Sequence, residues 1–174
     1  MVATLKRYAA LNVAAVLAIP GLYVAALKKY IVFSGRAPRL EFCAFLVITL
    51  VIGYMLDQAA KVSGIADTIG LVFGWAMFLP FVSLTVRRLH DFGASGWWFI
   101  IVFSPFFFAP FVINFYPAVV ADAEKAAHSW IYLVTFGTIC GVAYIIFHLV
   151  LILKGGDKDD NKHGAPSKAA PQGA

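Results

Sequence analysis

The sequence predicts an all-α polytopic membrane protein, with four transmembrane helices and an N-terminal hydrophobic segment at the membrane interface. Of its 174 residues, 61% are hydrophobic and 13% are charged. Soluble domains carry about 25% charged residues. Too few polar side chains are therefore present to cover a water-facing surface, and the lipid bilayer is the expected solvent.

Long apolar runs predict the individual helices. Crossing about 30 Å of hydrocarbon takes about 20 residues. Three runs meet this length with no Lys, Arg, Asp or Glu: 68–86, 92–121 and 129–153. A fourth run, 42–56, is shorter, but Asp57, Gln58 and Lys61 can reach the headgroups. The predicted helices lie near 42–60, 65–86, 97–120 and 130–153.

Three regions follow from this pattern. Residues 1–33 form the N-terminal hydrophobic, interfacial segment, and residues 34–153 form the four-helix bundle. Residues 154–174 alternate Lys and Asp and then turn to Ala, Pro, Gly and Ser, which predicts a disordered polar tail.

The basic residues indicate the orientation. If residues 8–27 do not cross, twelve Lys and Arg face the cytoplasm and only Lys61 and Lys125 face outward. If residues 8–27 cross with the N-terminus outside, the ratio is ten to four, and this fifth span remains the alternative. A cleaved signal or the opposite crossing would turn most basic residues outward, against the positive-inside rule. We therefore predict four spans with a cytoplasmic C-terminus. Because the basic residues separate apolar blocks, nucleic-acid binding is not expected.

Small residues and prolines mark features within the helices. Gly70 and Gly74, and likewise Gly137 and Gly141, stand four apart and predict helix packing faces. The run 97–120 contains three prolines and Asn114, so this helix should be kinked or broken. A broken helix can line a transport path, which gives one alternative function.

A polar cluster is predicted where two connecting segments share the cytoplasmic face. Its members are Arg36, Arg39, Glu41, Arg87, Arg88, His90 and Asp91, with the interfacial Trp97 and Trp98. Four arginines face two carboxylates, which leaves a charge of +2 with His90 neutral. Glu41 and Asp91 could pair with arginines as a structural clamp, with Asp91 four residues after Arg87 on one helix face. The surplus guanidinium groups could hold anionic lipid phosphate.

Several motifs resemble a known family. They are YVAALKKYIVFSGRAPRLEF, then RRLHDFGASGWW after one helical hairpin, then Asn161-Lys162-His163-Gly164 in the tail. Together they resemble domain-of-unknown-function family 805, small bacterial inner-membrane proteins, across roughly residues 22–166. Cys43 departs from the pattern, since the family usually has tryptophan there. The resemblance implies a polytopic protein of the bacterial cytoplasmic membrane and no established activity.

The remaining residues do not assemble a catalytic site. His128 and His148 are separated by about 30 Å of helix, so they cannot share a metal ion. No cofactor or metal is predicted, and His148 is the one weak candidate for holding a cofactor inside a bundle. We expect a non-enzymatic accessory module that contacts lipids and associates with itself or other membrane subunits. The alternatives are a small transporter or channel component, and a cofactor-carrying subunit.

Overall fold

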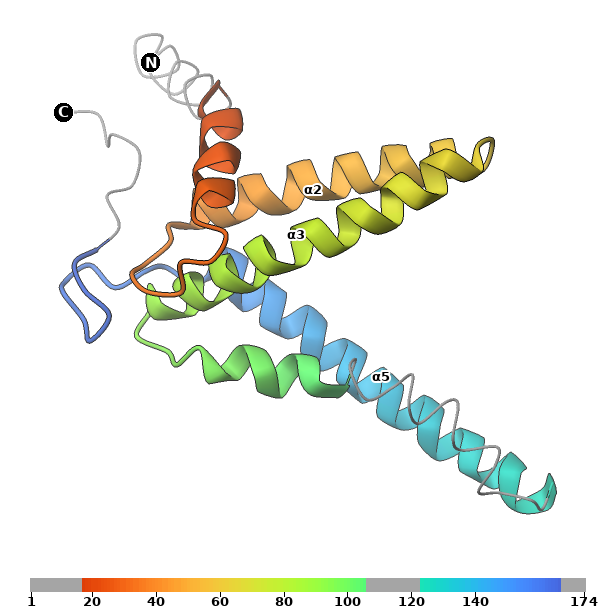
Figure 1. Ribbon diagram of the computed structural model, residues 1–174. Coiled ribbons are helices and arrows are strands. Elements are labelled where there is room, and N and C mark those ends of the chain that lie inside the picture. Colours follow the sequence, from red (N-terminus) through yellow and green to blue (C-terminus); the bar gives the residue numbers. More distant parts are fainter. Residues whose placement is uncertain (1–16, 106–122, 167–174) are drawn as a thin grey trace, which may run out of the picture. The chain divides into compact units, whose positions relative to one another are not determined.

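The computed structural model describes residues 17–105 and 123–166, with side chains from residue 133 onward in the second stretch. The long helices are α2 (Arg39–Ala60), α3 (Gly64–His90) and α5 (Ala123–Leu153) (Figure 1). Residues Leu17–Lys28 and residues 97–105 are also helical. In these stretches no strand forms, and the only β-type contact is an isolated bridge between Asn161 and Gly164. The all-α class is thus confirmed.

Among the described residues, three helices are long and apolar enough to cross a membrane: α2, α3 and the Leu133–Leu153 part of α5. The predicted third span, 97–120, is helical over residues 97–105, and the rest of it lies outside the described residues. The chain divides into two compact units. The first contains residues 1–95 and 155–174, and the second contains residues 96–154.

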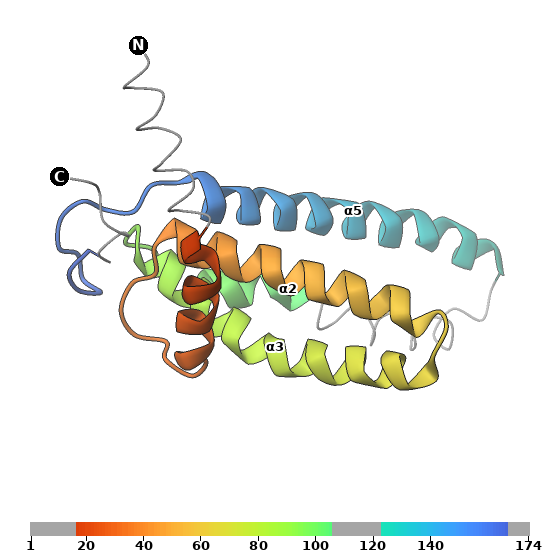
Figure 2. The ribbon, with the colours of Figure 1, turned by 90° about the horizontal axis from the view of Figure 1, so that it is seen from above.

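In the first unit, α2 and α3 form an antiparallel hairpin and lie side by side along their length (Figures 1 and 2). Pro38 precedes α2 in an extended conformation, and Glu41 places an anion in the first helical turn, where the helix dipole favours it. Ser63 immediately precedes α3 after a short turn, and its carbonyl accepts the first hydrogen bonds of the helix, from Ala66 N and Asp67 N. A Cβ built on Gly70 would lie 3.8 Å from Leu56 Cβ, so this glycine faces α2.

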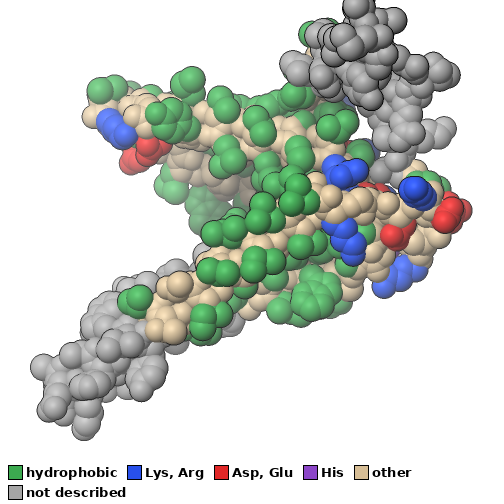
Figure 3. All heavy atoms as spheres, turned by 180° about the vertical axis from the view of Figure 1, so that it is seen from behind, with side chains coloured by type: hydrophobic (Ala, Val, Ile, Leu, Met, Phe, Trp, Pro, Cys, Tyr) green, Lys and Arg blue, Asp and Glu red, His purple; other side chains and the backbone are tan. Residues whose placement is uncertain are grey.

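Most of the hairpin surface is apolar. Large side chains such as Leu50, Trp75 and Leu71 are more than 60% exposed, as expected of helices whose outer faces contact lipid tails. Charged side chains gather at helix ends, and hydrophobic side chains cover the lengths between them (Figure 3).

The helix Leu17–Lys28 runs across the hairpin rather than along it in both ribbon views (Figures 1 and 2). Tyr23 stacks on Phe45 with ring centroids 5.6 Å apart and donates a hydrogen bond to the Met77 sulfur at 3.5 Å. The chain then turns, and Ser83 in α3 donates to the Lys29 carbonyl at 3.1 Å. The segment is therefore docked at the end of the hairpin where α2 begins.

The buried core of the first unit lies at this same end. Its apolar members include Phe42 and Phe45 from α2, Leu84 and Leu89 from α3, and Ala37 from the preceding loop. Buried charged residues lie directly beside them. The end of the hairpin that holds the charges is thus also the best-packed part of this unit.

The second unit holds an aromatic cluster between residues 97–105 and α5. Phe103 stacks on Phe99 with centroids 4.2 Å apart and meets Tyr144 edge-on at 5.2 Å. A Cβ built on Gly137 or Gly141 would meet no described atom within 4 Å, and the same is true of Gly74 in α3. The packing role expected of these three glycines remains a prediction.

Candidate functional site: a polar cap on the hairpin

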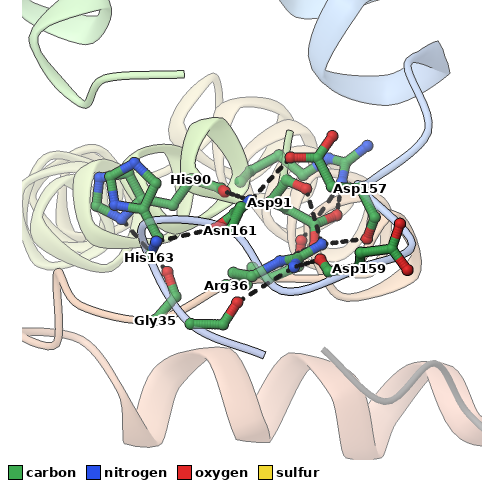
Figure 4. A network of polar contacts seen from close by, with 11 residues as sticks. Gly35, Arg36, His90, Asp91, Asp157, Asp159, Asn161 and His163 are labelled. Atoms are coloured by element: carbon green, nitrogen blue, oxygen red, sulfur yellow. Dashed lines mark hydrogen bonds and ion pairs between the residues drawn. The ribbon is translucent and has the colours of Figure 1, made fainter. Parts of the chain in front are cut away.

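Three segments far apart in the sequence meet beyond the charged end of the α2–α3 hairpin: the loop before α2, the turn after α3, and the tail after α5 (Figure 4). We call the residues that join these three segments the polar cap. It consists of Arg36, Glu41, Arg87, Arg88, His90, Asp91 and tail residues 156–164.

One ion pair joins the two helices. Arg87 Nη1 donates to Glu41 Oε1 at 3.0 Å, and the two side chains are 2% and 6% exposed. The Ala37 backbone N–H donates to the Arg87 carbonyl at 3.0 Å, which fixes the loop before α2 against the end of α3. Of the two acids offered by the sequence, Glu41 accepts from Arg87, whereas Asp91, four residues after Arg87, accepts from other arginines.

Asp91 stands between the other two buried arginines. Arg36 Nε donates to Asp91 Oδ1 at 3.0 Å, and Arg88 Nη1 donates to Asp91 Oδ2. Arg88 is fully buried and also lies 5.6 Å above the centre of the Phe92 ring. One carboxylate therefore pairs with two guanidinium groups. Loss of this acid would leave two buried positive charges without their counter-ion.

Arg36 uses all five of its N–H donors. Besides the Asp91 carboxylate, its Nη2 donates to the Asp91 carbonyl at 3.0 Å and to the Asp157 carbonyl. Its Nη1 donates to the carbonyls of Asp159 at 2.9 Å and Gly164 at 3.3 Å. A guanidinium has five N–H groups, so none remains for another acceptor. Arg36 is thus the centre around which the tail is folded.

A turn in the tail completes the contact. Asn161 Nδ2 donates to the His90 carbonyl at 3.0 Å and to Asp157 Oδ2 at 2.9 Å, while its Oδ1 accepts from the His163 N–H at 2.9 Å. The His163 and His90 rings stack with centroids 3.7 Å apart and planes 7° apart. His163 Nε2 is also hydrogen-bonded to Ala94 O, which holds the tail turn against the segment after α3. His90 Nδ1 is hydrogen-bonded to Gly35 O in the loop before α2.

Two glycines allow the segments to approach. Gly93, just beyond the end of α3, has φ +71°, and the bonds from Gly93 N to His90 O and from Ala94 N to Leu89 O close the helix in a Schellman motif. Gly156 passes directly over Asp91. A Cβ at Gly156 would lie 2.1 Å from Asp91 Oδ2, so only glycine fits there.

The tail between 155 and 166 therefore corrects the sequence-based expectation of disorder. Its composition is polar, but its backbone carbonyls and the Asn161 amide find buried partners on the cap. Residues 167–174 lie outside the described residues. The Asn-Lys-His-Gly sequence was a detectable turn signal, and the pair Gly155-Gly156 marked a close backbone approach.

The other predicted members of the cluster are exposed. Arg39 is the first residue of α2 and is exposed. Trp97 and Trp98 begin the helix of the second unit and are 71% and 53% exposed, as expected of side chains at a membrane interface.

His148, the weak cofactor candidate, is packed within the second unit. Its Nδ1 is hydrogen-bonded to the Tyr144 carbonyl at 3.0 Å, and its ring lies 4.2 Å from that of Tyr144 and 6.0 Å from that of Phe103. These contacts give the ring a place in an aromatic cluster. In the described parts of the chain, no three His, Cys, Asp or Glu side chains are grouped so as to hold a metal ion.

Comparisons with known proteins agree with the motifs. The model of the family "Protein of unknown function (DUF805)" matches residues 30–165. Inner membrane protein YhaI of Escherichia coli (strain K12) is 36% identical over 85 residues, or 48% of this chain and 72% of that protein. Inner membrane protein YhaH of the same strain is 35% identical over 92 residues, or 48% of this chain and 74% of that protein. No solved structure matches significantly. The chain belongs to the DUF805 family and is a membrane protein.

Proposed function

We propose that the chain is a four-span, non-enzymatic accessory module of the bacterial cytoplasmic membrane. In this role it associates with itself or with a larger membrane complex and contacts anionic lipid at its cytoplasmic face. The observation that carries the proposal is the polar cap, which joins segments flanking the first and last long helices and commits its buried charges to holding them together.

The cap supports an even number of crossings. Arg36 precedes α2, Asp91 follows α3, and residues 157–164 follow α5, yet all three are in contact. Segments in contact through polar groups lie on one side of the bilayer, since no polar backbone crosses hydrocarbon unpaired. This supports an even number of crossings between residues 96 and 155. We assign two, one to α5 and the other to the apolar run predicted over 97–120.

The N-terminal segment supports an interfacial position. Its described helix, Leu17–Lys28, lies across the hairpin and ends at the exposed Lys28 and Lys29. A helix across the spans is oriented as an interfacial helix is, with its basic residues in the headgroup layer. Together with the excess of Lys and Arg on the cap side, this favours a cytoplasmic cap.

The form of the cap favours a structural role. Buried ion pairs and the fully used donors of Arg36 fix one arrangement of three chain segments, whereas a catalytic centre needs polar groups directed at a substrate. Because Arg36 is committed to the tail, the proposed contact with lipid headgroups falls to exposed basic residues of the same end, namely Arg39, Lys28 and Lys29.

Topology and association need separate tests. In a chain with Cys43 and Cys140 replaced by serine, a membrane-impermeant maleimide should label K61C in intact cells. The same reagent should label A165C only after permeabilisation. Labelling of A165C in intact cells would overturn the orientation. The association is tested by isolating the protein in mild detergent and identifying bound protein and lipid by mass spectrometry. A lone monomer without lipid would contradict the accessory role.

A further inference from the structure

The three buried arginines of the polar cap are not equally satisfied. Every N–H donor of Arg36 has an acceptor, and each buried side-chain nitrogen of Arg88 also has a hydrogen-bond partner. Arg87 differs: its Nε and Nη2 are buried and have no hydrogen-bond partner among the described residues. The residue is 1% exposed, and within the described part of the chain its side chain makes one hydrogen bond, from Nη1 to Glu41.

The two donors without partners form one edge of the guanidinium. Nε–H and Nη2–H point in parallel and together match two oxygens of a carboxylate or phosphate. Arg36 shows the edge in use, since its Nε and Nη2 grip the carboxylate and the carbonyl of Asp91. Burying such donors without an acceptor costs several kcal/mol in general, so an acceptor outside the described chain is expected.

The buried charges of the cap support the same conclusion. Three buried arginines face two buried carboxylates, Glu41 and Asp91, which leaves one buried positive charge, while the three Asp and two Lys of residues 157–162 are exposed. The helix termini do not cancel it, because α3 ends and α2 begins at this end and their partial charges oppose each other. A monoanion at the open edge of Arg87 would neutralise the buried cluster.

The depth of Arg87 suits a phosphate. The charge-free stretch of α3, residues 68–86, is about 28 Å long at 1.5 Å per residue, close to the thickness of the hydrocarbon layer. Arg87 is the next residue, at the level where lipid phosphates begin. A phosphodiester carries one negative charge and two unesterified oxygens, which fits both the charge and the fork.

We propose that the Nε and Nη2 edge of Arg87 is a built binding site for a phosphate group, supplied by a phospholipid headgroup or by free inorganic phosphate. The inference rests on the proposed function only in placing this end of α3 at the headgroups. Because the edge is covered, the ligand enters by displacing side chains, and exchange is slow.

The site is tested on the full chain in a phosphate-free, non-ionic detergent, with arginine labelled by ¹⁵N. The chain has five arginines, so few Nε–H signals are present. Phosphatidylglycerol is added to one sample and inorganic phosphate to another, each against sodium chloride of equal ionic strength. We expect the Arg87 signal to shift with at least one of them in slow exchange. A shift with the lipid alone identifies a headgroup site, and a shift with both identifies a phosphate site open to small anions.

The variant R87K keeps the charge and removes the fork, so we expect binding at least about tenfold weaker. R39K is the matched control at an exposed arginine and should leave the affinity unchanged. If R87K does not accumulate, E41Q identifies the Arg87 signal instead, because it removes the acceptor of Nη1 and leaves the open edge. An Arg87 signal that neither addition shifts overturns the inference. Water would then be the partner of both donors. That result leaves the labelling test of topology and the isolation test of association untouched.

Discussion

The tail-facing and membrane-facing sides of the polar cap differ in where their buried arginines find hydrogen-bond acceptors. On the tail-facing side, Arg36 is surrounded by acceptors from the chain itself, most of them backbone carbonyls of residues 157–164. On the membrane-facing side, Arg87 has a single acceptor, Glu41, and a buried edge without a described partner. One side is thus closed by acceptors of the chain itself, whereas on the other side Nε and Nη2 of Arg87 have no acceptor among the described residues.

Closing the tail-facing side has a consequence for assembly. Arg36 and Asp91 precede the last long helix, but the carbonyls of Asp157, Asp159 and Gly164 follow it. The hydrogen bonding of Arg36 is therefore complete only when the end of the chain has returned to the cap. Residues distant in sequence supply each other's polar partners, which makes the closed cap a cooperative unit.

The largest effect is expected from D91N, which removes the carboxylate shared by Arg36 and Arg88. Breaking a buried pair by removing one partner costs about 3–5 kcal/mol, since it leaves uncompensated buried charge. We expect the purified protein to unfold at a much lower temperature and to accumulate poorly in membranes. The matched control is D57N at an exposed carboxylate. A D91N protein as stable as the wild type would show that Asp91 does not hold the cap.

The membrane-facing side is tested by exchanging its charges. E41R and R87E should each lower thermal stability strongly, because each places two like charges together in a buried site. The double variant should recover part of the loss, since contacting residues couple by about 0.5–3 kcal/mol. The unfolding temperatures of the four proteins give this coupling. Additive losses in the double variant would mean that the pair contributes nothing specific.

Tail docking is tested at Gly156. G156A places a methyl group 2.1 Å from Asp91 Oδ2 and should displace the tail, with an overpacking cost of about 1–3 kcal/mol. The amide of Asp157, which donates to Asp91 O at 2.7 Å, should then exchange with solvent much faster, and a protease should cleave the tail sooner. G155A is the control, because a Cβ there meets nothing within 4 Å among the described atoms. Equal protection in G156A and G155A would contradict the docked tail.

The sequence predicted the helices better than their polar partners. Apolar runs set the positions of α2 and α3, because the length that crosses a bilayer is a strong and local signal. The sequence offered both Glu41 and Asp91 as partners for the arginines, and the helical i, i+4 spacing of Arg87 and Asp91 could not decide which acid each arginine contacts. The tail was missed for a related reason. Its contacts are made mainly by backbone carbonyls onto Arg36, and carbonyls carry no sequence signature.

The smallest effect is expected from K61Q, at the opposite end of the hairpin. Lys61 Nζ lies 3.6 Å from Asp57 Oδ2 in an i, i+4 pair, but the two side chains are 62% and 68% exposed. Exposed pairs of this kind contribute about 0.3–0.5 kcal/mol, and salt screens them further. K61Q should therefore change the unfolding temperature by no more than about 2 °C in a chain of this size. A loss comparable to that of E41R would mean that pairing alone, and not burial at the cap, stabilises the hairpin. The two ends of the hairpin would then not differ in how ion pairing stabilises them.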